Sequence, residues 1–170
     1  EGEVPNIGGL NICFSFLLTY LIFEFDQMSQ NQFFLIGLFA IMAVGFIDDI
    51  LVLTPIAKLF GEALASIALI GFADIRITHL HGIFGIEEIG IIPSYLISLF
   101  VLIAIINAVN LIDGIDGLAS GLVILYCFFF AIYFGLVGEK SWSILGICMI
   151  GALAVFFIYN VFGRKEKIFM

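Results

Sequence analysis

The sequence predicts an all-α, polytopic membrane protein with about six transmembrane helices. Of its 170 residues, 63% are hydrophobic and only 12% are charged, whereas about 25% are charged in an ordinary soluble domain. A water-soluble fold could not hide this much apolar surface, so the solvent around the helices must be lipid. The apolar residues also gather into separate runs of roughly helical length, which indicates several membrane spans.

Six apolar runs account for the predicted helices. In chain order they cover Gly9–Phe25, Phe33–Ile47, Leu59–Ala73, Pro93–Ile112, Leu118–Val137 and Trp142–Phe162. Several runs are shorter than the roughly 20 residues that a helix perpendicular to the bilayer needs. We therefore expect flanking residues to enter the membrane as well.

The segment at about residues 74–92 has a different pattern. Ile75 and Ile77 alternate with other residues, glycines interrupt the segment, and Pro93 follows it. Partial alternation with glycine breaks is typical of a short hairpin or turn. We predict a short extracytoplasmic β-hairpin or ordered loop there.

Six spans would place both chain ends on one face of the membrane. The same face would receive the connection Asp48–Lys58 and the end of the fourth run. It would hold most of the basic residues, namely Lys58, Arg164, Lys165 and Lys167. An excess of lysine and arginine marks the cytoplasmic side, so we expect the polar motifs to meet at the cytoplasmic face.

A polar stripe at the end of the fourth run is the most unusual feature. It consists of Asn107, Asn110, Asp113 and Asp116. Charged groups at membrane depth cost free energy and are usually functional. A step of three residues turns an α-helix by about 300°, so the stripe would drift around the helix. Because glycines permit a break, we expect the helix to loosen near Gly114, with Asn110 and Asp113 on one inward face and Asp116 in the turn beyond.

Two further polar groups lie at and just beyond the connection between the second and third runs. Asp48 and Asp49 are adjacent, so they can face one ligand only if the helix ends there, and they repel each other unless a cation is near. An ordinary acidic pair in water is the alternative. Lys58 and Glu62 are four residues apart. A surface ion pair is the favoured interpretation of this spacing, and a phosphate contact by Lys58 is the functional one.

The charge balance limits the chemistry. The net charge is −8, which argues against nucleic acid as a partner. A phosphate substrate could bind beside these carboxylates only together with a divalent cation, and hard oxygen ligands suit Mg²⁺, with Mn²⁺ as the alternative. A metal at a phosphate favours phosphoryl or phosphosugar transfer. A site at a membrane face suggests one lipid-borne and one soluble substrate.

The motifs resemble those of the polyprenyl-phosphate N-acetylhexosamine-1-phosphate transferases, in glycosyltransferase family 4. The matching stretches are Val4–Gly9, Gly45–Asp49 with Lys58 downstream, and Asn107–Ala119. The resemblance implies transfer of N-acetylhexosamine-1-phosphate from a UDP-sugar such as UDP-N-acetylglucosamine to a polyprenyl phosphate such as undecaprenyl phosphate. This reaction starts a cell-envelope glycan, for example lipopolysaccharide or teichoic acid, and uses Mg²⁺.

The resemblance also implies roles for individual residues. It makes Asp48, Asp49 and Asp113 catalytic, and it places Asn110 and Asp113 at the metal. The residues that it assigns to substrate binding are Lys58, Asn107, Gly114, Ile115 and Asp116. It further implies a bacterial cytoplasmic (inner) membrane, an active site that faces the cytoplasm, and a homodimer as a candidate assembly.

The resemblance has departures. Members of that family have about ten or eleven spans, and a Gly-Asp metal loop follows a stretch like Lys167–Met170, where this sequence stops. The chain also begins with Glu1 rather than methionine. We therefore expect residues 1–170 to be a single transmembrane domain of a larger enzyme, inactive by itself.

A membrane transporter or ion pathway is the rival interpretation. Intramembrane carboxylates carry protons or cations in such proteins, which predicts ionisable groups near the middle of several spans. The polar residues here gather instead at one predicted face. An inert membrane scaffold, the third interpretation, leaves the polar stripe unexplained.

Overall fold

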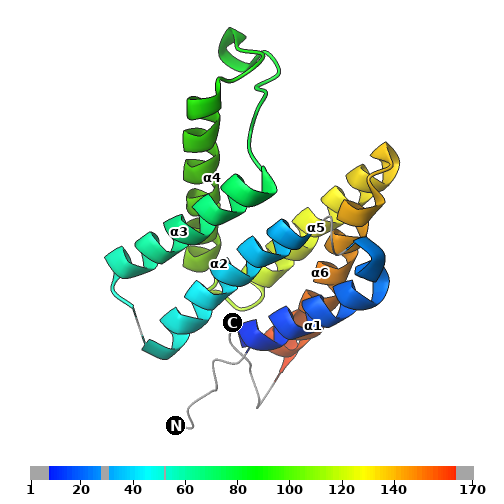
Figure 1. Cartoon of the computed structure of the whole chain (residues 1–170). Coiled ribbons are helices and arrows are strands. Elements are labelled where there is room, and N and C mark those ends of the chain that lie inside the picture. The colour runs from blue at the N-terminus through cyan, green and yellow to red at the C-terminus, as the bar shows by residue number, and fades with distance from the viewer. Residues whose placement is uncertain (1–7, 28–30, 52, 164–170) are drawn as a thin grey trace. The chain divides into compact units, whose positions relative to one another are not determined.

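Each of the six predicted runs forms an α-helix. The structure, a computed structural model, describes residues 8–27, 31–51 and 53–163, with only the backbone described for Gln27 and Asp49. The α-helices are α1 (Gly8–Glu24), α2 (Gln32–Leu51), α3 (Pro55–Ala73), α4 (Ile91–Ile112), α5 (Leu118–Val137) and α6 (Lys140–Phe162), and the 3₁₀ turns are η1 (Phe25–Gln27) and η2 (Ile83–Gly85) (Figure 1). The Val4–Ile7 part of the first motif and Arg164–Lys167 lie outside the described residues.

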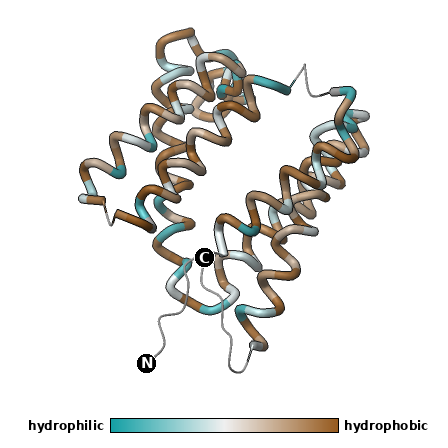
Figure 2. The backbone as a smooth tube through the Cα atoms, turned by 60° about the horizontal axis from the view of Figure 1, so that its bottom comes forward, coloured by the Kyte–Doolittle hydropathy of each residue, from teal (hydrophilic) through white to brown (hydrophobic). Residues whose placement is uncertain are grey.

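The helices carry the apolar surface of a membrane protein. α3, α4, α5 and α6 are 19 to 23 residues long and apolar enough to cross a membrane, while α1 and the Gln32–Asp48 part of α2 are shorter. Large apolar side chains face outward along them, and Ile56, Leu111 and Leu136 are each more than 80% exposed. Figure 2 shows that apolar residues dominate the helices. Because water would penalise so large an apolar surface, the helices belong in lipid. The count of six spans stays a prediction.

The chain divides into two compact units. One comprises residues 1–29 and 109–170, and the other comprises residues 30–108. In the first unit, α6 packs against both α1 and α5, around a core of Ile12, Leu153 and Phe156. A hydrogen bond of 2.7 Å from the Ser141 hydroxyl to Glu24 joins the start of α6 to the end of α1.

In the second unit, α2 and α3 form a tightly packed helical hairpin. Gly37 of α2 lies against Leu69 of α3, and a Cβ at Gly37 would overlap that leucine. Small residues allow such close approach between membrane helices. α3 begins with a strong signal, because the Thr54 hydroxyl accepts a hydrogen bond from the amide of Ala57 and Pro55 occupies the first turn. Proline suits this position, where its missing N–H would be unpaired anyway.

The segment between α3 and α4 is an ordered loop. A single antiparallel bridge joins His79 and Glu88, supported by backbone hydrogen bonds of 2.9 Å from Leu80 to Glu87 and from Ile89 to Thr78. The structure assigns no regular strand within residues 53–163. The β-hairpin alternative is therefore not confirmed, because the chain turns at once into η2, where Phe84 adopts a positive φ of 56°.

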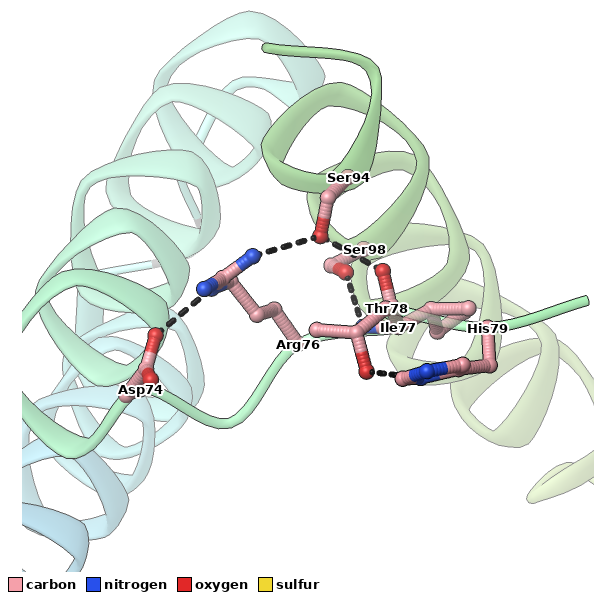
Figure 3. A network of polar contacts seen from close by, with 7 residues as sticks. All are labelled: Asp74, Arg76, Ile77, Thr78, His79, Ser94 and Ser98. Atoms are coloured by element: carbon pink, nitrogen blue, oxygen red, sulfur yellow. Dashed lines mark hydrogen bonds and ion pairs between the residues drawn. The ribbon is translucent and has the colours of Figure 1, made fainter. Parts of the chain in front are cut away.

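Two buried serines of α4 hold this loop in place (Figure 3). The Ser98 hydroxyl accepts a hydrogen bond of 2.7 Å from the amide of Ile77, and the Ser94 hydroxyl donates one of 2.5 Å to the carbonyl of Ile77. Buried backbone groups need partners, and here α4 supplies them in place of a neighbouring strand.

Arg76 completes the same network. Its guanidinium donates a hydrogen bond of 2.6 Å to Asp74 and one of 3.2 Å to the Ser94 hydroxyl, and it lies over the ring of Tyr95, 5.4 Å from the centroid. The hydrogen bond to the Asp74 carboxylate raises the pKa of Arg76. Arg76 therefore remains charged, and it ties the end of α3 to the start of α4.

Candidate functional site

The polar stripe crosses the end of α4 and continues into a turn. α4 ends at Ile112, and Asp113 to Gly117 form the connection to α5. The predicted loosening near Gly114 is therefore confirmed, although the helix ends one residue before Asp113. Asp113 thus belongs with Asp116 to the turn, and not with Asn110 to the helix as expected. Hydrogen bonds of 3.3 Å from Ile115 to Ile112 and 3.0 Å from Leu118 to Ile115 shape this turn.

Most of the predicted site residues in this stretch reach the surface. Asn110, Gly114, Ile115 and Asp116 are exposed, and Asp113 is partly buried. The turn therefore offers amide and carboxylate oxygens that a ligand can reach. These are the hard oxygen donors that a magnesium ion prefers.

The far end of the turn is fixed to α6. The backbone amide of Gly117 donates a hydrogen bond to the side-chain oxygen of Asn160, a residue only 5% exposed. Gly117 has a φ of 73°, and a Cβ there would collide with Val161. Only glycine adopts this backbone conformation without strain, so the sequence of the turn and its packing on α6 agree.

The near end of the stripe is fixed to α3. The side-chain amide of Asn107 donates a hydrogen bond of 2.6 Å to Glu62 Oε2 and one of 3.0 Å to the carbonyl of Ile103. Glu62 is only 3% exposed. The interpretation of Glu62 as half of a surface ion pair with Lys58 is therefore wrong.

Lys58 instead pairs with Asp48. The Lys58 ammonium lies 2.6 Å from Asp48 Oδ2, with the two side chains 23% and 21% exposed. The other oxygen of Asp48 accepts a hydrogen bond of 3.0 Å from the amide of Leu53. Asp48 therefore closes the turn between α2 and α3, and its charge is compensated by a lysine, as two adjacent carboxylates require. The side chain of Asp49 lies outside the description.

These contacts connect the two polar motifs through α3. Lys58 and Glu62 are one helical turn apart, a rise of about 6 Å. Lys58 holds Asp48, and Glu62 holds Asn107. One face of α3 thus joins the acidic pair at the end of α2 to the beginning of the stripe on α4. Asp113 belongs to the other compact unit, so its approach to Asp48 stays a prediction.

A magnesium site fits the donors of the stripe. Within residues 8–27, 31–51 and 53–163, no group of three histidine, cysteine, aspartate or glutamate side chains is arranged to hold a metal. Mg²⁺ often uses only one or two carboxylates and takes its remaining ligands from water and substrate phosphates. The carboxylate of Asp113 and the amide oxygen of Asn110 have the chemistry that such an incomplete protein site needs.

Two residues that the sequence analysis did not assign to the site contribute to its geometry. Asn160 is the one residue with an amide or charged side chain in the apolar run Trp142–Phe162. Such residues within membrane spans are often functional, and this is the signal that could have found it. For Glu62 the signal was its position, since it is a charged residue within the third apolar run. Its spacing from Lys58 favoured a surface pair and concealed its contact with α4.

Comparison with known proteins finds one matching family and several similar proteins. A family profile described as Glycosyl transferase family 4 matches residues 31–170. The undecaprenyl-phosphate alpha-N-acetylglucosaminyl 1-phosphate transferase of Yersinia pestis is 30% identical over 177 residues, which cover 100% of this chain and 47% of that protein. The phospho-N-acetylmuramoyl-pentapeptide-transferase of Clostridium botulinum (strain Eklund 17B / Type B) is 34% identical over 184 residues, which cover 100% of this chain and 55% of that protein.

Another similar protein has the same name as the relative from Yersinia pestis. The undecaprenyl-phosphate alpha-N-acetylglucosaminyl 1-phosphate transferase of Escherichia coli O157:H7 is 27% identical over 173 residues, which cover 100% of this chain and 47% of that protein. No solved structure matches the chain. The chain spans about half the length of the curated relatives that it matches. Because the family profile covers most of its residues, the chain belongs to glycosyl transferase family 4.

Proposed function

We propose that the protein carrying this chain transfers N-acetylhexosamine-1-phosphate from a UDP-sugar to polyprenyl phosphate. A single observation carries the proposal: side chains of α3 connect Asp48 with Asn107. It joins two polar motifs in a chain that belongs to a family of transferases. The names of the relatives support a phosphosugar as the transferred group and undecaprenyl phosphate as an acceptor.

The proposed reaction exchanges one phosphoanhydride bond for another. An oxygen of polyprenyl phosphate forms a bond to the phosphorus that carries the sugar, and the bond from that phosphorus to the bridging oxygen breaks. UMP leaves with the bridging oxygen and its electron pair. The product is polyprenyl-diphospho-N-acetylhexosamine. Such a reaction depends chiefly on positioning and on neutralising charge.

The residues divide this work by position. Asp48 and Asp49 serve the polyprenyl phosphate, and Lys58 stabilises the local negative charge beside Asp48. Asn107, Gly114, Ile115 and Asp116 bind the UDP-sugar. Asn110 and Asp113 would hold Mg²⁺, with Mn²⁺ as the alternative. When bound, such a cation neutralises diphosphate charge and orients the leaving group.

The sugar nucleotide is the finer part of the proposal. We propose UDP-N-acetylglucosamine, because the names of the relatives from Yersinia pestis and Escherichia coli O157:H7 specify N-acetylglucosaminyl 1-phosphate as the transferred group. The alternative is UDP-N-acetylmuramoyl-pentapeptide, which the name of the Clostridium botulinum relative suggests. The first donor would assign the protein to the start of a glycan such as lipopolysaccharide or teichoic acid, and the second to peptidoglycan.

The membrane setting follows from the same proposal. Polyprenyl phosphate lies in the bilayer and UDP-sugars are soluble, so the site belongs at the cytoplasmic face of a bacterial inner membrane. Within the part of the chain that the structure describes, four apolar helices of sufficient length support the membrane location. A homodimer is the proposed assembly. The transporter alternative is not favoured, because family membership explains the polar stripe without an ion pathway.

A turnover assay tests this proposal. The protein that carries this chain is purified at its natural length in detergent and incubated with undecaprenyl phosphate, Mg²⁺ and one of the two UDP-sugars. We expect UMP release and a lipid-linked sugar product with UDP-N-acetylglucosamine. Product from UDP-N-acetylmuramoyl-pentapeptide alone would reassign the donor. Absence of product with both donors would contradict the proposed function. We expect residues 1–170 by themselves to release no UMP.

A further inference from the structure

We propose that Glu62 is a positioning residue that sets the orientation of the Asn107 side-chain amide toward the UDP-sugar. The inference rests on the proposed function, because it assigns to Asn107 a contact with that substrate. It goes further by naming a residue outside the polar stripe as the group that prepares the stripe for binding.

The burial of Glu62 is the first argument. Only 3% of this residue is exposed, and it lies in α3, a helix long and apolar enough to cross a membrane. A buried carboxylate is costly unless it is hydrogen-bonded. Ionisable residues in membrane helices are rare and usually have a functional role. Here the side-chain amide of Asn107 donates the required hydrogen bond, at 2.6 Å.

The chemistry of the pair is the second argument. Glu62 Oε2 is the acceptor of this hydrogen bond, whereas an asparagine amide has a donor end and an acceptor end. Glu62 therefore forces the NH₂ group of Asn107 toward α3. The same NH₂ group also donates to the carbonyl of Ile103. Both N–H bonds are thus engaged, and the carbonyl oxygen is the end of the amide that remains for a ligand.

The arrangement of the helices is the third argument. The described residues of α3 and α4 do not pack backbone to backbone as those of α2 and α3 do. The contact between Glu62 and Asn107 therefore joins two loosely packed helices. It contributes little stability, because burying a carboxylate offsets much of the gain from its hydrogen bond. Its specific effect is to orient Asn107, one helical turn before Asn110.

The test uses the protein at its natural length and measures KM and kcat with varied UDP-sugar. We expect Glu62→Leu and Asn107→Ala each to raise KM for the UDP-sugar about tenfold, the worth of one substrate hydrogen bond, with a smaller change in kcat. Because the two residues act as one unit, the double variant should be no worse than the poorer single variant. Glu24→Leu is the matched control, since Glu24 is also buried and bonded to Ser141, and its KM should equal that of the parent.

A reversed pair keeps the test decisive if Glu62→Leu fails to fold. Asn107→Asp places two carboxylates together and should raise KM. Adding Glu62→Gln supplies an amide that donates a hydrogen bond to one oxygen of the new carboxylate, while the other oxygen of that carboxylate faces the ligand. KM should then return to within about threefold of the parent value.

Two results would overturn the inference. One is a parental KM in a folded Glu62→Leu variant, and the other is failure of Glu62→Gln to relieve Asn107→Asp. Neither resembles a failure of the proposed function, in which the parent protein itself would release no UMP. Thermal unfolding of each purified variant separates loss of fold from loss of binding.

Discussion

Asn160 of α6 accepts a hydrogen bond from the backbone amide of Gly117, at the point where the polar stripe passes into α5. The amide belongs to a residue with a φ of 73°, so the contact holds the backbone in a conformation that other residues avoid. Leaving this partly buried amide without a partner would destabilise the folded protein by about 1 kcal/mol. The turn that contains Asp113 and Asp116 therefore depends on a residue 43 positions further along the chain than Gly117.

Replacing Gly117 with alanine should destabilise the protein. The new Cβ would impose strain at a positive φ and would collide with Val161, so we expect a loss of roughly 1–3 kcal/mol. Thermal unfolding of the purified protein measures this loss. Gly114→Ala is the matched control, because a Cβ at Gly114 meets nothing within 4 Å and its φ is not positive. Equal stability of both variants would contradict the close packing of Gly117 on α6.

Asp48→Asn should separate the structural role of this residue from its catalytic one. An asparagine oxygen can still accept the hydrogen bond from Leu53 that closes the turn after α2. We therefore expect thermal stability close to that of the parent, while loss of the carboxylate should lower kcat roughly a hundredfold.

A parental kcat for Asp48→Asn would show that Asp48 only closes the turn. Lys58→Met serves as the companion variant, since it removes the ammonium 2.6 Å from Asp48 and leaves the carboxylate uncompensated. It should lower both stability and activity.

Asp113 and Asp116 should have different kinetic roles, although both lie in the turn. Asp113→Asn removes a charge from the proposed magnesium site, so we expect a lower kcat and a higher Mg²⁺ requirement. Asp116→Asn should mainly raise KM for the UDP-sugar. Steady-state kinetics with varied UDP-sugar and varied Mg²⁺ distinguish the two. Exchanged effects would reverse the assignment, and full activity of both variants would make the stripe structural.

Asp48 and Asp113 should approach to within about 10 Å, a distance that a magnesium ion and a diphosphate can bridge. Cysteines at both positions, in a protein in which Cys13, Cys127 and Cys148 and any cysteine outside residues 1–170 are replaced by alanine, should be cross-linked by a reagent of that span. His79, in the loop predicted to lie outside the cytoplasm, provides the control position with Asp113. Cross-linking of the control pair but not of the first pair would refute a single shared site.

The helices could be predicted from the sequence, but not all of their ends. α2 continues to Leu51 and α3 begins at Pro55, four residues beyond the apolar runs on each side. The apolar pattern stops near Asp48 in α2 and Lys58 in α3, but both helices continue past these residues, whose opposite charges neutralise each other. The combination of Thr54 and Pro55 was the local signal for the true start of α3.

The candidate site could be predicted only as a set of side chains along the chain. The stripe and the break after it follow from local spacing and glycine content. The contacts of Glu62 with Asn107 and of Asn160 with Gly117 join residues more than 40 positions apart. Such pairings depend on how helices pack, and neither a lone asparagine nor an i,i+4 charge pair indicates its partner.

The helix α4 has polar groups near both of its ends, and the serines near its start bind Ile77 of the preceding loop. The loop after α3 is fastened to its first turns by Ser94 and Ser98, and the polar stripe begins on its last turns. A helix of 22 residues is about 33 Å long. The loop after α3 and Asn107, the first residue of the polar stripe, are therefore attached to one continuous helix.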